Sequence, residues 1–186
     1  MTRRRPSIAL LLASLLVLGG CSSIVGTPTP TPTPPPDIDV TLANEGNRSY
    51  TLAYWTVEGP VDAVTEVTTD GERRVVDNLT GTAGARLFRP DDVRAVEWPD
   101  EADQRGSFTL GPGSSVSGPV EDPAPRTTVL FLARTDDRVV TWGTADCGAD
   151  DALTVVDFTM DERGPGLGIG CAGLGGGGTP DERTGR

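Results

Sequence analysis

The chain contains no histidine and no lysine, and these two absences exclude most familiar catalytic sites. All 16 of its basic residues are arginines. Without histidine there is no Ser-His-Asp or Cys-His triad, no His-ligated metal and no blue-copper centre. Without lysine there is no Schiff base and no Ser-Lys dyad. The sequence also lacks the G-x-x-x-x-G-K-[ST] phosphate loop and the G-x-S-x-G elbow, so we expect no catalytic residue, no cofactor and no metal ion.

Carboxylates are the reactive side chains that remain, and they occur in short runs. The runs are Asp91-Asp92, Asp100-Glu101 with Asp103, Asp136-Asp137, Asp146 with Asp150-Asp151, and Asp161-Glu162. A carboxylate pair can hydrolyse a glycoside or bind Ca²⁺, but no run fits the D-x-[DN]-x-[DN]-G calcium loop. Adjacent side chains on a strand point to opposite faces and do not converge. We interpret the runs as solvated surface, with a calcium site and a carboxylate-dependent hydrolase as the weaker alternatives.

The one long apolar segment runs from Ile8 to Leu18 and is too short to span a bilayer. It has eleven residues, whereas a membrane-spanning helix needs about 20. Arg3 to Arg5 precede it and Gly19-Gly20-Cys21 follows, which is the order of a signal peptide. We predict that residues 1–20 are a signal peptide and that Leu18-Gly19-Gly20-Cys21 directs lipid attachment to Cys21. A plain cleavage site beside an unmodified cysteine is the alternative, and the choice between Sec and twin-arginine export stays open.

Residues 21–37 carry the anchor cysteine and a Thr/Pro-rich linker. Thr27 to Pro36 reads TPTPTPTPPP, which cannot form a helix or a sheet because proline lacks the N–H and fixes φ. The tract favours a disordered or polyproline II stalk of roughly 30 Å, at about 3.1 Å per residue. Its threonines are candidates for O-linked sugars, with a bare spacer as the simpler interpretation.

The signal, the Gly-Gly-Cys box, the Thr-Pro stalk and the acidic, lysine-free domain together resemble the Cys-anchored surface lipoproteins of haloarchaea. The specific part of this resemblance covers residues 1–36, and it implies an anchoring mode and no active site. It places the protein on the outer, extracellular face of the cell membrane. A high-GC bacterial lipoprotein is the alternative.

The charge of the chain agrees with a halophilic origin. Asp and Glu number 27, and loss of the three signal-peptide arginines would change the formal charge from −11 to −14. Such self-repulsion is tolerated best where salt screens it, the Debye length being about 3 Å at 1 M. It also argues against nucleic acid and anionic lipid headgroups as partners.

Two cysteines remain once Cys21 carries a lipid. Cys147 and Cys171 are an even pair in an exported protein, so we predict a disulfide worth roughly 3.5 kcal/mol in the chain-entropy model. The alternative is a metal pair, but two thiols without histidine make a poor zinc site.

Residues 38–172 show alternating apolar and polar positions, and this period of two predicts strands. The expected strands are Ile38–Leu42, Tyr50–Tyr54, Val64–Thr69, Glu72–Val76, Phe108–Leu110, Thr127–Ala133, Val139–Trp142 and Leu153–Met160. Turn signals such as Asp70-Gly71 separate them. The pattern predicts an all-β domain, an antiparallel β-sandwich that is loosely immunoglobulin-like, although the Cys…Trp…Cys spacing of true immunoglobulin domains is absent.

Two segments of this part, and the chain that follows it, are predicted to be something other than strand. Pro90 to Val96 looks briefly helical, with proline suited to a first turn. Gly164 to Gly170 is interpreted as a flexible loop, and residues 173–186 as a disordered Gly-rich tail. We interpret Trp55, Trp98 and Trp142 as core or strand-edge packing, with sugar-stacking platforms as the alternative.

Asn47-Arg48-Ser49 and Asn78-Leu79-Thr80 are N-glycosylation sequons, so Asn47 and Asn78 are candidate modification sites. Three function classes remain for the chain. The first is a non-enzymatic surface module that binds a surface protein or supports the envelope. The second is an accessory ligand-capture lipoprotein of a transporter or respiratory assembly, and the third is a small carboxylate-dependent hydrolase.

Overall fold

The computed structural model describes residues 34–79 and 84–174, and every regular element in these ranges is a β-strand. The signal peptide, Cys21 and nearly all of the Thr/Pro linker lie outside the described residues, and so does the chain after Leu174. Within the described ranges no helix has the length and apolar character needed to cross a membrane.

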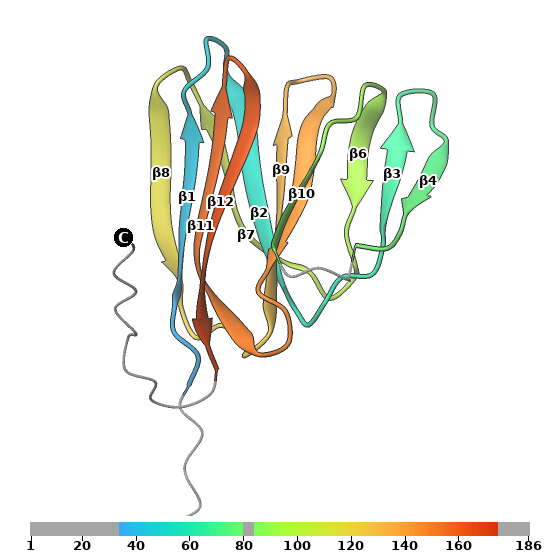
Figure 1. Cartoon of the computed structure of the whole chain (residues 1–186). Coiled ribbons are helices and arrows are strands. Elements are labelled where there is room, and N and C mark those ends of the chain that lie inside the picture. The colour runs from blue at the N-terminus through green and yellow to red at the C-terminus, as the bar shows by residue number, and fades with distance from the viewer. Residues whose placement is uncertain (1–33, 80–83, 175–186) are drawn as a thin grey trace, which may run out of the picture. The chain divides into compact units, whose positions relative to one another are not determined.

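The strands form three sheets that lie on one another as layers (Figure 1). Sheet A has the order β12-β11-β1-β8 and consists of β1 (Ile38–Asn44), β8 (Ser114–Val120), β11 (Asp151–Asp161) and β12 (Gly164–Gly173). Sheet B has the order β5-β10-β9-β2-β7 and consists of β2 (Tyr50–Glu58), β5 (Gly84–Phe88), β7 (Asp103–Leu110), β9 (Thr127–Arg134) and β10 (Val139–Asp146). Sheet C has the order β4-β3-β6 and consists of β3 (Val64–Thr68), β4 (Arg73–Val76) and β6 (Val93–Glu97).

Sheet B is the middle layer, and its central strands are buried on both faces. One core lies between sheets A and B, where Phe131 of β9 stacks on Phe158 of β11 with ring centroids 5.1 Å apart. A second core lies between sheets B and C, where the fully buried Trp142 stacks on Phe88 at 4.1 Å. This position explains why side chains along β9 are buried from Thr127 to Ala133 without alternation.

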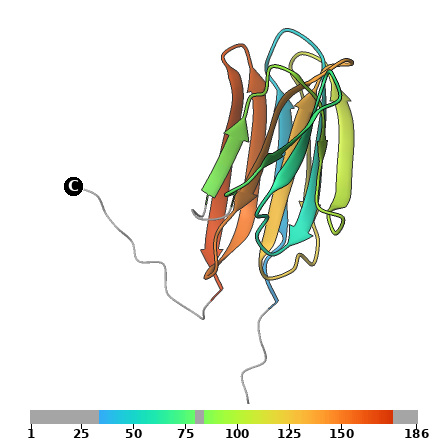
Figure 2. The same ribbon diagram turned by 90° about the vertical axis from the view of Figure 1, so that its right-hand side faces the viewer.

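The predicted antiparallel β-sandwich is confirmed, with an added third layer and one exception in strand direction. β1 pairs antiparallel with β8 but parallel with β11, and every other pair in the described sheets is antiparallel. Sheets A and B are joined at both edges: β7 turns into β8 on one side, and β5 lies beside β12 on the other (Figure 2). Sheet C meets sheet B where β6 lies against β10.

Two of the sequence-based predictions are wrong. Pro90 to Val96 is not helical, because Val93 to Glu97 form β6 and pair with β3. Val93 is fully buried in the core between sheets B and C, so tertiary pairing decides its conformation. Gly164 to Gly170 is not a loop but most of β12, which extends to Gly173. Its apolar side chains alternate with glycines, and Leu167 and Ile169 pack on the core between sheets A and B.

Candidate binding site

A groove lies where sheet B extends beyond sheet C. On the face of β2 that points toward sheet C, Thr51, Ala53 and Trp55 alternate, and Ala53 pairs with Ser107 of the edge strand β7. Sheet C has three strands and sheet B has five, so sheet C leaves part of sheet B uncovered. This part of sheet B borders β6 across an open space of about 310 Å³. We call it the Trp groove. Its lining includes aromatic, cationic and polar side chains: Trp55, Trp98, Arg94, Arg134, Gln104 and Ser107.

The aromatic rings of the groove continue into the core. The centroids of Trp55 and Trp98 are 5.3 Å apart with ring planes tilted by 48°, and both residues are half-buried. Trp98 in turn meets the edge of Trp142 at 5.9 Å. The prediction of core packing therefore describes Trp142 well, whereas Trp55 and Trp98 pack on the core and also line the surface groove.

A polar network beside this aromatic series joins sheet C to sheet B through the buried pair Trp142 and Glu66, and it continues to the exposed Arg74 and Asp92. The indole Nε1–H of Trp142 donates a hydrogen bond of 2.8 Å to Oε1 of Glu66, which is only 8% exposed. Arg74 lies 3.7 Å from the other carboxylate oxygen of Glu66 and 2.5 Å from Asp92. The hydrogen bond to Asp92 is the main reason why the pKa of Arg74 is raised. Because a buried charge without partners is costly, the network fixes the place of β3 and β4 on sheet B.

The Trp groove is positively charged on an acidic protein. Its lining contains Arg94 and Arg134 and no carboxylate. Four other hollows of the described surface each include at least one Asp or Glu. Neither guanidinium pairs with a described carboxylate, whereas Arg73, Arg74 and Arg105 all do. The groove is therefore able to attract an anion.

Irregular strand pairing is concentrated around the same groove. The described sheets contain four register shifts, and three of them fall at the groove. At each of these three shifts one strand carries an extra residue. This residue is Arg94 in β6, the residue after Gln104 in β7 and the residue after Val139 in β10. β-Bulges bend a strand and redirect its side chains, and they are frequent beside functional sites.

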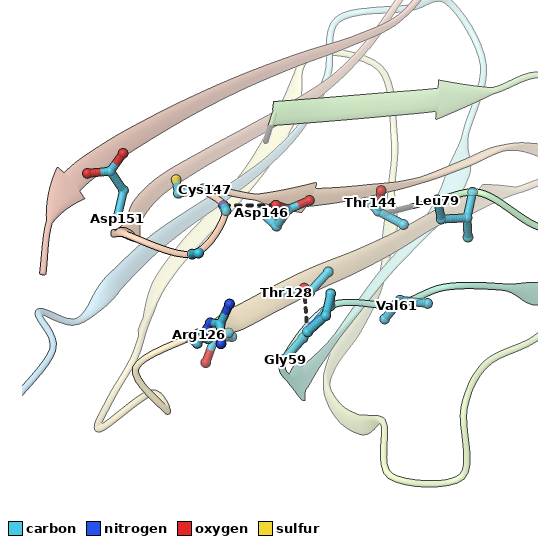
Figure 3. Close-up of a pocket in the computed structure, with 13 residues that line it drawn as sticks. Gly59, Val61, Leu79, Arg126, Thr128, Thr144, Asp146, Cys147 and Asp151 are labelled. Atoms are coloured by element: carbon cyan, nitrogen blue, oxygen red, sulfur yellow. Dashed lines mark hydrogen bonds between the residues drawn. The ribbon is translucent and has the colours of Figure 1, made fainter. Parts of the chain in front are cut away.

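A second hollow, the end pocket, is a weaker candidate (Figure 3). Its volume is about 250 Å³, and it lies where β2 ends and β9 begins. Its polar groups serve the local structure: the Thr128 hydroxyl donates to the Gly59 carbonyl at 2.7 Å, and Asp146 accepts from the Gly148 amide at 2.9 Å. It also borders Leu79, after which residues 80–83 are not described, so we assign no function to it.

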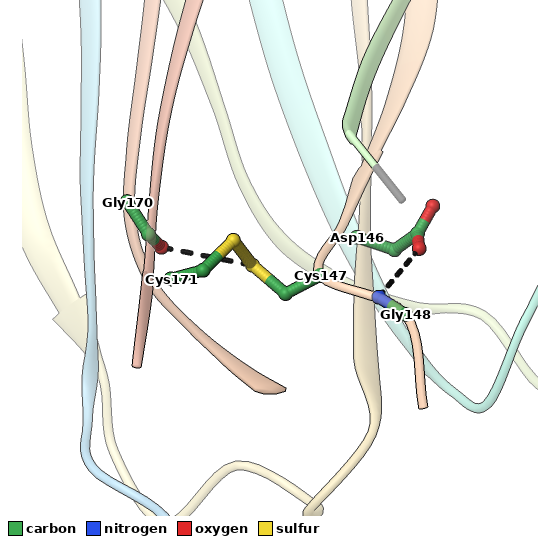
Figure 4. Close-up of a disulfide and its surroundings, with 5 residues drawn as sticks. All are labelled: Asp146, Cys147, Gly148, Gly170 and Cys171. Carbon is green, nitrogen blue, oxygen red and sulfur yellow. Dashed lines mark hydrogen bonds between the residues drawn. A yellow bond between two sulfur atoms is a disulfide. The ribbon is translucent and has the colours of Figure 1, made fainter. Parts of the chain in front are cut away.

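The expected disulfide is present at the end of sheets A and B (Figure 4). It joins Cys147, which follows β10, to Cys171 in β12, with Cα atoms 5.8 Å apart. The two sulfur atoms are bonded to each other and offer neither a nucleophile nor a metal ligand. No group of three Asp, Glu, His or Cys side chains in residues 34–79 and 84–174 is arranged to hold a metal ion.

The comparison with known families decides what kind of domain this is. A family model described as "Halobacterial Ig domain protein" matches residues 1–176. The chain belongs to this family. The match agrees with the immunoglobulin-like prediction and with a haloarchaeal origin, but it names no ligand. No curated protein and no solved structure matches this halobacterial Ig domain protein at a significant level.

The other predicted modification sites are only partly covered. Asn47 is exposed in the turn after β1. Asn78 is exposed with a φ of 56°, and its Nδ2 donates to the Asp77 carboxylate at 2.7 Å. Thr80 of that sequon lies outside the described residues, as Cys21 does. Glycosylation and lipidation of this halobacterial Ig domain protein therefore stay predictions.

Sequence patterns did not point to Arg94, Arg134, Gln104 or Ser107. No motif unites them, because they come from three different strands, β6, β7 and β9. The tryptophans were the only signal, in the alternative that they form a sugar-stacking platform.

Proposed function

We propose that this halobacterial Ig domain protein is an exported lipoprotein. In this proposal a lipid on Cys21 holds it to the outer face of the cell membrane. The immunoglobulin-like domain is presented on the Thr/Pro stalk and acts by binding, without catalysis. What carries the proposal is an Ig-like sandwich, in a chain of this family, that a Thr/Pro stalk separates from an N-terminal segment with the order of a signal peptide and a lipid-attachment box.

A binding role is supported by what the domain offers chemically. The chain has no histidine or lysine, and both cysteines of the domain are joined in a disulfide. The described surface carries instead a preformed groove with aromatic, polar and cationic side chains. Such a lining suits recognition, because pockets that bind ligands combine aromatic surface with a few placed polar groups.

Replacement of Cys21 tests the anchoring part of the proposal. Wild-type protein and Cys21→Ser protein are expressed in a halophilic host, and membrane and medium fractions are compared by immunoblot and mass spectrometry. We expect a lipid-modified N-terminal Cys21 in the membrane fraction and no lipid on the serine variant. A double Cys147→Ser, Cys171→Ser variant is the control, and it should stay anchored. A processed Cys21→Ser protein that remains fully in the membrane would contradict the proposal.

Capture of a free solute for a transporter or respiratory assembly is the second candidate function. The groove favours it to a degree, since Trp55 and Trp98 provide a binding surface. However, its volume of about 310 Å³ is at the lower end of ligand pockets, roughly 300–1,000 Å³, and one side is open. An open groove fits part of a larger molecule better than an enclosed solute, so we favour the surface-binding role.

A further inference from the structure

We infer that the Trp groove binds an acidic saccharide, with a sugar ring packed on the exposed indole surface and its carboxylate held by Arg94 and Arg134. This inference rests on the proposed function, because it names the class of molecule that the surface module binds. The two can fail separately, since anchoring depends on Cys21 and recognition depends on the groove.

The aromatic surface of the groove indicates that the ligand contains a sugar ring. A pyranose has an apolar C–H face and an edge of hydroxyl groups, so it needs a flat ring beside hydrogen-bonding side chains. Trp55 and Trp98 supply two half-buried rings 5.3 Å apart. Gln104 and Ser107 lie on the same side of sheet B and are exposed, so their amide and hydroxyl groups are free to meet sugar hydroxyls.

The two arginines of the groove indicate that the saccharide carries a carboxylate. Arg94 comes from β6 and Arg134 from the end of β9, so the groove receives a guanidinium from each of two sheets. Guanidinium groups bind carboxylates through paired hydrogen bonds, and such charge-assisted bonds survive where salt screens longer-range attraction. An uncharged sugar would leave both cations without a partner.

An acidic peptide is the main rival, and the strand edges beside the groove argue against it. Extended peptides commonly bind by adding a strand to a free sheet edge, and two edge strands border the groove, β6 of sheet C and β7 of sheet B. β6 has only five residues and is interrupted by a bulge at the charged Arg94, and β7 is interrupted by a bulge at the charged Arg105. Short, bulged and charged edges are the features that prevent strand addition. The groove therefore offers side chains more readily than backbone.

Tryptophan fluorescence of the full-length protein, purified in detergent at molar KCl, tests the inference. The acidic ligand is tri-galacturonate, and the matched uncharged ligand is maltotriose. The test variant is Arg94→Gln with Arg134→Gln, both on exposed residues where no fold defect is expected. The control is Arg138→Gln, an exposed arginine in the turn between β9 and β10, outside the groove.

We expect tri-galacturonate to change the fluorescence saturably and maltotriose to bind at least tenfold more weakly. The double variant should lose at least tenfold in affinity for tri-galacturonate, and the control should bind as the wild type does. Absence of saturable binding, or equal binding by the double variant, would overturn the inference. Equal responses to sulfate alone or to a tri-glutamate peptide would also overturn it, in favour of a simple anion or an acidic peptide.

Discussion

The two faces of sheet B differ in what they bury and in how they are closed. Toward sheet A the core is mainly apolar, with the fully buried Asn44 at the end of β1 donating a hydrogen bond to the Leu110 carbonyl, and sheets A and B are connected at both edges and by a disulfide. Toward sheet C the core contains the Trp142–Glu66 hydrogen bond, and one side opens into the Trp groove. The comparison shows how one fold separates two requirements. In our proposal, the closed interface between sheets A and B supplies stability, while the partly open interface with aromatic and charged groups supplies a surface for recognition.

The largest effect is expected from a change in the core between sheets A and B. Phe158 is fully buried against Phe131, so Phe158→Ala removes a large apolar side chain and leaves a cavity. We expect the free energy of unfolding to fall by about 3–5 kcal/mol. Chemical denaturation in high salt measures this loss. A loss below about 1 kcal/mol would show that this interface is not the main source of stability.

Removal of the disulfide should act on the same interface. Cys147→Ser with Cys171→Ser frees the end of β12 from the chain that follows β10. The expected loss is roughly 3.5 kcal/mol, because the unfolded chain regains the entropy of an open loop. Denaturation with and without reductant provides the check. Wild-type protein under reductant should match the double variant, and a reductant effect on the variant would contradict this explanation.

A smaller and more local effect is expected between sheets B and C. Trp142→Phe keeps an aromatic ring but removes the N–H donor to the buried Glu66. We expect a loss of roughly 2–3 kcal/mol from reduced packing and an unsatisfied carboxylate oxygen. Glu66→Gln is the matched control, since its amide oxygen still accepts from Trp142 and it should lose about 1 kcal/mol or less. If both variants lose the same amount, the hydrogen bond is not what holds sheet C.

The smallest effect concerns a turn of sheet B. The Thr135 hydroxyl donates to Asp137 at 2.9 Å and is the main reason why the pKa of Asp137 lies below its ordinary value of 3.8. A lowered pKa in the folded state stabilises the fold above the pKa of the unfolded state, and this contribution is lost as the pH falls through the folded pKa. Asp137→Asn should therefore cost a little stability at pH 7 and nothing in strong acid.

Asp136→Asn is the control for this pH effect. It removes the same charge from the same turn, but the Asp136 side chain has no hydrogen bond from a described residue. Both variants should lower the salt requirement for folding, because each relieves repulsion on an acidic surface. Thermal unfolding at several pH values separates the two effects. A pH-dependent loss in both variants would contradict the role of the Thr135 hydrogen bond.

The sequence predicts the strands of sheets A and B well where apolar residues alternate. Ile38 to Leu42 and Leu153 to Met160 are examples, and both lie within observed strands. The pattern does not predict β12, because glycines occupy every second position of that strand from Gly164 to Gly170. It does not predict β6, because Pro90 is typical of the first turn of a helix. The disulfide followed from counting cysteines.

The third layer and the groove could not be predicted in the same way. The segments around Val64 and Val76 read as a hairpin, and they do pair, but nothing in them states that the hairpin covers sheet B. The groove depends on the register of β2 with β7 and on the position of β6 against β10. Arg94 and Arg134 are 40 residues apart and become neighbours of one space only after sheets B and C have formed.

Hydrogen exchange along the chain, with and without tri-galacturonate, tests the division between the two faces most directly. Amides of β3, β4 and β6 should exchange by local opening well before those of β1, β2, β9 and β11, because sheet C has only three strands and borders the open groove. The saccharide should slow exchange in β6 and β7 beside the groove and leave β11 and β12 unchanged. Uniform protection of all three sheets, with no change on addition of the saccharide, would contradict the account.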